Sequence, residues 1–545
     1  MKRTLSLVLA LIMVFSLLAG CQSNSSANNN NGTNTGDAPV SKPTELTFYC
    51  EPAGQNFPDG FNYTENWFID TIEEMANVKI TSMNVPEYVD AATKFNLMMA
   101  SGEIPDIICS FQTKDMKRYG VEGAFLDLEP LIRANAGIMA YYKNDDNYID
   151  AMRGEDGKLW TIQEKARVDD FDVIAIRLDQ FEELGYTFDE IPLNDMDAIG
   201  DILGEWKEGH DGSVALASQP AGNWRASWMI RPFDTAFTGW MYDFKTGQVR
   251  NAWDCDGIVE SVSWVHQLYA DGILDPEFIT TNSSDEQNMR HSRDVMWYFQ
   301  NSGGQVGMVS GTLQLQPTAK VVPMAIPMDE STGMANYIQG MSLVGGFTWG
   351  ISGKLKDQAT IDACVRLIEA YCSPEVKSLS DYGREGHEYK MVDGMPTAIQ
   401  PAQADSSWKT FYGMMHLNGI DAVTFNMLQA IDQYSQLPDA DKAEYKKLVN
   451  DQMRNGVKNQ KLNHNVYDPT TFLAPFEDKI TNRVTECNEY MKTVYTRAVL
   501  GEITIDQFIA ERDKIVKDYQ DITDVYNEAI APLIAKYPTL KFVVE

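Results

Sequence analysis

The sequence predicts an α/β protein with at least two lobes, each a mixed or parallel sheet covered by helices. Between residues 45 and 110, strand-like and helix-like segments alternate in the order β-α-β-α-β. That order is typical of a parallel sheet with helices on both faces. A second strand and helix begin at residue 172. About 500 residues follow the polar N-terminal region. That length is too large for a single small hydrophobic core, so it favours two or three lobes.

Each predicted element follows from its hydrophobic spacing. In the first block we expect strands at 45–50, 78–85 and 106–110 and helices at 66–76 and 91–100. In the second block we expect strands at 172–177, 306–310, 321–326 and 343–352, and helices at 178–185, 259–272 and 360–372. The last seventy or so residues favour helix, with no Gly or Pro between Glu502 and Ile530. Ligands of parallel sheets bind beyond the carboxyl ends of the strands, so we expect the site in those loops.

The first twenty residues have the pattern of a secretory signal peptide. Lys2 and Arg3 precede an apolar stretch, which ends in Leu18-Ala19-Gly20-Cys21. A cysteine after two small residues resembles a bacterial lipobox, in which the sulfur takes a diacylglycerol and the chain is cut before it. Two acyl chains suffice for stable anchoring. We therefore predict a signal peptide at 1–20 and a lipidated Cys21 with a flexible polar linker at 21–43; the alternative is an ordinary signal peptide with an incidental cysteine.

Composition excludes several classes of function. The formal net charge of −33 argues against binding to nucleic acid or to an anionic membrane face. No CxxC, HExxH or GxSxG motif is present, and the six histidines are scattered, so we predict no metal, no cofactor and no catalytic residue. Cys364 and Cys372 would lie ~12 Å apart along one helix, beyond disulfide reach, and are expected in the core.

Several short motifs occur in an order that resembles the family 1 extracellular solute-binding proteins, in their large lipoprotein branch. Residues 100–107 (ASGEIPDI) are similar to its "SGxxPDI" signature, and 156–162 (DGKLWTI) to its "DGKxYxxP" crossover, although Gln163 stands where proline is common. Further matches are 176–185 to "YRKDxLxxLG", 268–277 (LYADGILDPE) to "LYxEGLIDPE" and 381–389 (DYGREGHEY) to "YGxEGxxY". Residues 188–197 lack the alternating oxygen ligands of a calcium loop, so we predict no calcium there.

This resemblance implies a two-lobed clamp of the periplasmic-binding-protein type 2, whose lobes close on a ligand. Lobe 1 would comprise 44–163 and 320–385, and lobe 2 would comprise 164–319 and 386–545 with a helical C-terminal part. The resemblance further implies a monomer at the extracytoplasmic face of the cell membrane. This monomer would capture a carbohydrate, specifically an oligosaccharide, and deliver it to an ABC permease. No GxxxxGK[ST] loop is present, so the ATPase would be another chain.

The candidate ligand-binding residues are aromatic side chains and polar side chains in loops. A pyranose has an apolar face and a hydroxyl rim, which suits an aromatic platform edged by polar groups. The candidates are Glu51, Gln112, Gln163, Trp224, Trp228, Trp240, Thr312, Phe347, Trp349 and Arg384. Core packing is the alternative for each tryptophan, an ordinary loop contact for the others, and a structural ion pair for Arg384.

Two other functions fit the same sequence. A sensor ectodomain would use the same clamp to present a ligand to a signalling partner. A secreted glycoside hydrolase would need two carboxylates at a set separation, and 78 acidic residues always supply some pair. Peptide ligands also remain open.

Overall fold

The structure of the protein is a computed structural model, which divides into the units Met1–Lys42 and Pro43–Glu545. The residues that it describes are 42–51, 62–87, 90–154, 156–166, 172–192, 195–210, 213–281, 296–301, 305–325, 328–329, 334–335, 342–392, 395–399, 420–463, 467–472 and 478–543. The predicted signal peptide, Cys21 and the linker lie outside them. The helices and strands of the described residues all belong to the second unit.

The first sheet has five strands in the order β2-β1-β3-β12-β4. Its strands are β1 (Thr44–Cys50), β2 (Val78–Asn84), β3 (Ile107–Ser110), β4 (Ile162–Lys165) and β12 (Val344–Ile351). β1 is parallel to β2 and β3, as the β-α-β-α-β pattern predicts. β12 is antiparallel to both β3 and β4. The carboxyl ends of β1, β3 and β4 and the amino end of β12 therefore meet at one edge.

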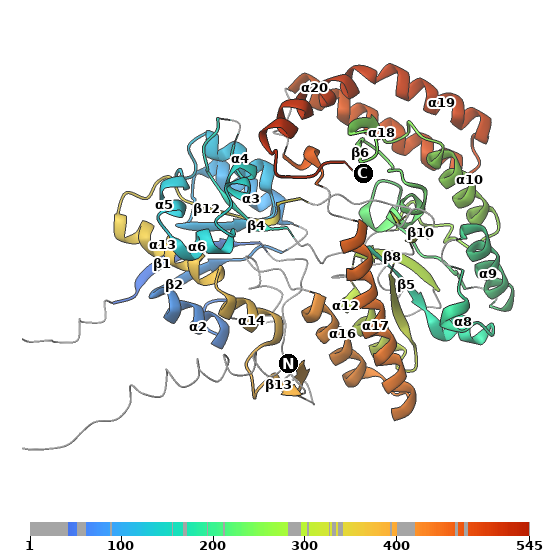
Figure 1. Ribbon diagram of the computed structural model, residues 1–545, viewed down its shortest axis with the longest axis horizontal. Helices are drawn as coiled ribbons and strands as arrows, with labels where there is room; N and C mark the ends of the chain where they lie inside the picture. Colours follow the sequence, from blue (N-terminus) through green and yellow to red (C-terminus); the bar gives the residue numbers. More distant parts are fainter. Residues whose placement is uncertain are drawn as a thin grey trace, which may run out of the picture. The chain divides into compact units, whose positions relative to one another are not determined.

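Helices cover both faces of this sheet. They are α2 (Trp67–Ala76), α3 (Ala91–Ser101), α4 (Thr113–Val121), α5 (Glu129–Arg133), α6 (Ala136–Tyr141), α7 (Asp146–Ala151), α13 (Gln358–Tyr371) and α14 (Pro374–Tyr382). Asn66 and Asp357 cap α2 and α13 through their side-chain oxygens. α13 packs against α2 and β1 (Figure 1). Phe48 and Trp349 lie in the core on this face, and Tyr49 and Phe95 in a smaller core on the other.

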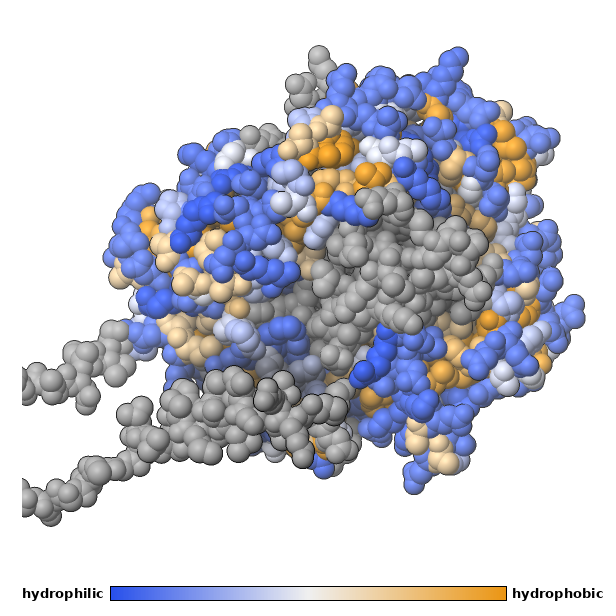
Figure 2. All heavy atoms as spheres, viewed as in Figure 1, coloured by the Kyte–Doolittle hydropathy of each residue, from blue (hydrophilic) through white to orange (hydrophobic). Residues whose placement is uncertain are grey.

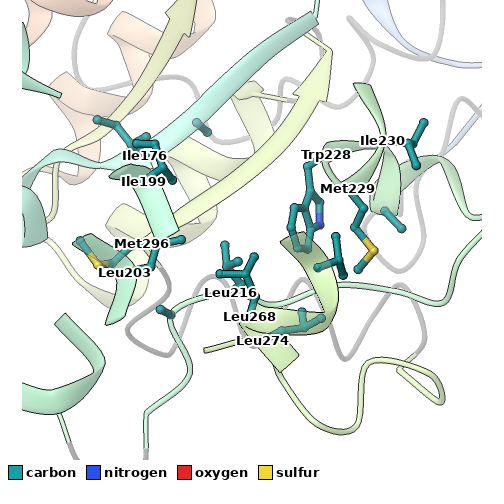
Figure 3. Packing of buried hydrophobic residues seen from close by; sticks show 14 of the residues in the cluster. Ile176, Ile199, Leu203, Leu216, Trp228, Met229, Ile230, Leu268, Leu274 and Met296 are labelled. Atoms are coloured by element: carbon teal, nitrogen blue, oxygen red, sulfur yellow. The ribbon is translucent and has the colours of Figure 1, made fainter. Parts of the chain in front are cut away.

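The second sheet has the order β8-β5-β9 and is antiparallel throughout, which corrects the expectation of a mixed or parallel sheet in each lobe. Its strands are β5 (Asp172–Arg177), β8 (Trp297–Asn301) and β9 (Val321–Ala325). Around it lie α8 (Leu178–Glu183), α9 (Met196–Gly209), α10 (Gly257–Ala270), α12 (Gln305–Leu315), α16 (Ile420–Tyr434) and α17 (Asp439–Asn463). Figure 3 shows part of their shared core, in which Leu203 of α9 and Leu268 of α10 point inward.

Two further expectations about this part of the chain are corrected. Residues 306–310, predicted as a strand, lie in α12, where Met308, Val309 and Leu313 are buried at helical spacing. Five apolar-rich residues alone do not distinguish a strand from a turn of buried helix. β9, which the expected division puts in lobe 1, pairs with β5 in the second sheet. β9 therefore moves from the predicted lobe 1 to lobe 2, and the other bounds of the two lobes stay a prediction.

The C-terminal part is helical, as expected. It comprises α18 (Asp478–Val499), α19 (Ile505–Asp518) and α20 (Gln520–Lys536), preceded by a short 3-10 turn, η5 (Pro469–Phe472). α20 packs on the hairpin of β6 (Trp240–Asp243) and β7 (Gln248–Asn251). Beyond it, Thr539 accepts a hydrogen bond of 3.1 Å from Asn147 of α7. The C-terminal segment thus connects the helical part with the first sheet's helices.

Two smaller hairpins are formed by β10 (Met328–Asp329) with β11 (Met334–Ala335) and by β13 (Tyr389–Val392) with β14 (Met395–Ala398). In the described part of the chain, every helix is too short or too polar to cross a membrane. On the face that Figure 2 shows, the described surface is mostly hydrophilic, with hydrophobic side chains in small areas.

Candidate functional site

The edge where β1, β3, β4 and β12 meet gathers several of the predicted ligand-binding residues. Thr348 of β12 is paired in register with Ser110 of β3 on one side and with Gln163 of β4 on the other. Its hydroxyl lies 2.7 Å from the hydroxyl of Thr113, the first residue of α4. Strand ends and a helix start thus bring hydroxyl and amide groups together, at the position where sheets of this kind bind ligands.

Glu51 lies at this edge but serves as an internal hydrogen-bond acceptor. Its side chain is fully buried. One carboxylate oxygen accepts the backbone N–H of Phe111 at 3.0 Å, and the other accepts the hydroxyl of Tyr49 at 3.2 Å. Burial raises the pKa of Glu51, and the hydrogen bond from Phe111 opposes that shift. Glu51 therefore holds the turn after β3 in place through these hydrogen bonds, and its buried side chain is not accessible to a ligand.

That turn positions an aromatic pair. The rings of Phe111 and Phe347 meet edge to face, 5.9 Å between centroids and at 83°. Both are half-buried. Phe347 lies in a bulge of β12, where the register with β4 shifts between Gly345 and Thr348. Gly346 has a φ of 62°, and a Cβ there would lie 2.1 Å from a carboxylate oxygen of the buried Glu164, so a larger residue would be strained and would displace that side chain.

Gln163 and Gln112 flank the threonine pair. Gln163 is 5% exposed, and within the described residues its side-chain oxygen has no hydrogen-bond partner. Gln112 is half-buried, and its backbone N–H donates to the Ser110 hydroxyl at 3.0 Å. Lys117, one turn along α4 from Thr113, donates to the carbonyl of Ala151 at 3.3 Å, and burial lowers its pKa to about 8. Gln112 and Thr348 are thus the polar residues that directly follow the two aromatic residues in sequence.

Two of the predicted tryptophans lie in the cores, the alternative that the sequence left open. Trp349 is fully buried between Phe48 and Tyr371, with ring centroids at 5.3 and 5.0 Å. Trp228 is 1% exposed, and its indole N–H donates to the Ser218 hydroxyl at 3.1 Å. Figure 3 shows its ring among the aliphatic side chains of the second core. Neither ring presents a face to a ligand in this structure.

The remaining candidates lie away from the edge. The half-buried Trp240 donates to the Thr523 hydroxyl at 2.8 Å and stacks on Tyr526. Thr312 is fully buried in α12. Arg384 pairs with Glu388 at 2.7 Å and lies over the ring of Trp67 at 4.3 Å, which agrees with a structural ion pair.

The backbone of Trp224 lies in the 3-10 helix η3 (Trp224–Met229), and its side chain is outside the described residues.

Sequence reasoning missed three members of the site: Phe111, Thr113 and Thr348. Phe111 follows directly on β3, so the rule that picked Gln112 could have found it. Thr113 and Thr348 are 235 positions apart, and only strand pairing places them in contact. Glu51, Gln112, Gln163 and Phe347 are the predicted residues that the fold does bring together here.

Two separate sheets, each covered by helices, define an α/β protein of the two-lobed class. Residues 67–379 match the family described as bacterial extracellular solute-binding protein, and the chain belongs to that family. No curated protein matches the chain.

Solved structures resemble the chain over about nine tenths of its length. The alginate-binding protein AlgQ2 without calcium ion is 19% identical, with a TM-score of 0.58, over 90% of this chain and 99% of that one. A solute-binding protein of Bifidobacterium longum infantis, described as HMO binding, is 14% identical with a TM-score of 0.61, over 89% and 100%. The N-glycan transport protein NgtS of Streptococcus pneumoniae is 14% identical with a TM-score of 0.61, over 90% and 99%. At these identities the likeness shows the two-lobed fold.

Proposed function

We propose that this protein captures an oligosaccharide at the edge of its first sheet, releases it unaltered and delivers it to an ABC permease. The observation that carries the proposal is the half-buried Phe111–Phe347 pair, beside the half-buried Thr113, whose hydroxyl is positioned by the hydroxyl of the buried Thr348. A sugar ring needs an apolar face for its C–H groups and hydroxyl or amide partners for its rim. The names of the similar structures, which concern alginate and N-glycan, support the same class of ligand.

The aromatic pair gives the sharpest test. A calorimetric titration with the oligosaccharide found in a thermal-shift screen would compare the wild type with Phe347→Ala. Removal of one aromatic contact costs about 1–2 kcal/mol, roughly fivefold to thirtyfold in Kd. The control is Phe188→Ala, because Phe188 is also half-buried but lies in the turn η2 (Phe188–Glu190) beside α8. Equal losses in both variants would reject the edge as the sugar site.

We further propose that the chain is held at the extracytoplasmic face of the membrane by a diacylglyceryl group on Cys21. The lipobox-like run before Cys21 supports this anchor, and the extracellular character of the family supports the compartment. In a bacterial host, the wild-type protein is expected in the membrane fraction with its signal peptide removed. The Cys21→Ala variant is expected either in the soluble fraction or with its signal peptide still attached. Membrane retention of a processed Cys21→Ala variant would contradict the anchor.

A further inference from the structure

Two cysteines lie opposite each other beneath the candidate site. Cys50 is the last residue of β1, and Cys109 is its Cα partner on the parallel strand β3. Both are fully buried in the same core, on the face of the sheet that α2 and α13 cover. Within the core they therefore occupy directly paired positions on two hydrogen-bonded strands. Directly paired residues on neighbouring strands are separated by ~4.8 Å, which lies inside the Cα range of disulfides, ~4.4–6.8 Å.

We propose that Cys50 and Cys109 form a reversible cross-strand disulfide site. The family of this chain is extracellular, and disulfides form and persist in oxidising compartments of that kind. Cys364 and Cys372 do not offer this geometry, because Cys364 lies in α13 and Cys372 caps its C-terminal end eight positions later, ~12 Å along the helix axis. The pair in β1 and β3 is instead held in register by the sheet itself.

The reaction is a thiol–disulfide exchange with a small disulfide such as oxidised glutathione. One cysteine thiolate attacks a sulfur of the oxidant, forms a mixed disulfide and expels one glutathione thiolate. The second cysteine thiolate then attacks the protein-bound sulfur, which closes the Cys50–Cys109 bond and expels the second glutathione thiolate. The protein gives up two electrons, the oxidant gains them, and the two protons pass to the glutathione thiolates. A thiol reductant reverses both steps.

Burial decides when this exchange happens. It raises the pKa of both thiols, so few thiolates are present in the folded protein, and it keeps the oxidant out. We therefore expect the bond to form while the exported chain folds or when the edge of the sheet opens, and slowly in the native state. Once formed, the bond would join the ends of β1 and β3, which Glu51 and the turn with Phe111 follow. The Glu51 N–H already donates to the Cys109 carbonyl at 3.0 Å, so the two strand ends are also joined by a backbone hydrogen bond.

The test is a count and map of thiols in the full chain, and it needs no ligand, so it is independent of the proposed function. Protein refolded from urea with oxidised and reduced glutathione is alkylated and mapped by mass spectrometry. The expected result is the loss of two free thiols, a cross-link between the peptides that contain Cys50 and Cys109, and a raised Tm that dithiothreitol reverses. Native protein treated in the same way should keep both thiols for far longer.

Variants separate this pair from the others. Cys50→Ala and Cys109→Ala should each abolish the cross-link, whereas Cys364→Ala should keep it. The circular-dichroism spectrum of each variant identifies those that fold. If a variant fails to fold, the cross-link map of the wild type still decides. Retention of both thiols after oxidative refolding, or a cross-link to another cysteine in their place, would overturn the proposal.

Discussion

Glu51 is the residue whose replacement tests the account of the site edge most sharply. Its carboxylate accepts the Phe111 N–H at 3.0 Å and the Tyr49 hydroxyl at 3.2 Å in a fully buried position. In Glu51→Leu the Phe111 N–H loses its acceptor, while the Tyr49 hydroxyl keeps a contact of 3.4 Å to the Ala91 carbonyl. One buried donor without a partner costs about 1–3 kcal/mol. Glu51→Gln can keep both contacts, because its amide oxygen accepts from Phe111 and its NH2 donates to Tyr49.

The two variants also differ in their pH dependence. Because burial raises the pKa of Glu51 in the folded protein above its ordinary value of 4.5, the ionised form favours unfolding. The stability that this carboxyl contributes is therefore full below pH 4.5 and is lost as the pH rises through its folded pKa. Glutamine does not titrate. The Tm of Glu51→Gln relative to the wild type should thus rise as the pH increases above 4.5.

Thermal unfolding followed by circular dichroism at several pH values measures both effects. We expect the Tm of Glu51→Leu to be lower than that of Glu51→Gln at every pH. We also expect Glu51→Leu to bind oligosaccharide more weakly than the wild type, because the turn that positions the Phe111–Phe347 pair loses a hydrogen bond. Parallel pH profiles for the wild type and Glu51→Gln, or a Glu51→Leu variant as stable as Glu51→Gln, would refute this reasoning.

Three further substitutions test the core and the bulge. Trp228→Ala should cost about 3–5 kcal/mol in urea denaturation, because it empties a buried site; a loss under 1 kcal/mol contradicts that placement. Gly346→Ala should lower the Tm, because a Cβ there would meet Glu164 at 2.1 Å and the φ is 62°; an unchanged melting curve speaks against the bulge. Thr312→Val should melt at or above the wild-type Tm, because within the described residues the buried Thr312 hydroxyl has no partner; a clear drop in Tm would reveal a missed partner.

The sequence predicts the first sheet well because local patterns encode it. The strands at 45–50, 78–85 and 106–110 and the helices between them are found where the hydrophobic spacing places them. β12 and β4 are different, because their places in the sheet depend on partners far along the chain. No local pattern says that Thr348 lies between Ser110 and Gln163.

The candidate site is predicted only in part, for a related reason. The rule that loops after strands bind ligands picks Glu51 and Gln112 correctly as edge residues. It does not say whether a side chain turns into the protein, as Glu51 does, or toward the edge. Tryptophan is an ambiguous signal, because the same indole fills a core, as in Trp228 and Trp349, or stacks on a sugar. Of the two phenylalanines at the edge, the sequence predicts Phe347, and the rule that picks Gln112 applies equally to Phe111.

The central claim is that the first sheet's edge holds a sugar and returns it unchanged. The most direct measurement is a calorimetric titration of the purified protein with oligosaccharides, followed by mass spectrometry of the ligand recovered after unfolding. We predict saturable 1:1 binding, weakened in Phe347→Ala, and recovery of the ligand at its original mass. Cleaved ligand, or binding that Phe347→Ala leaves intact, would contradict the account.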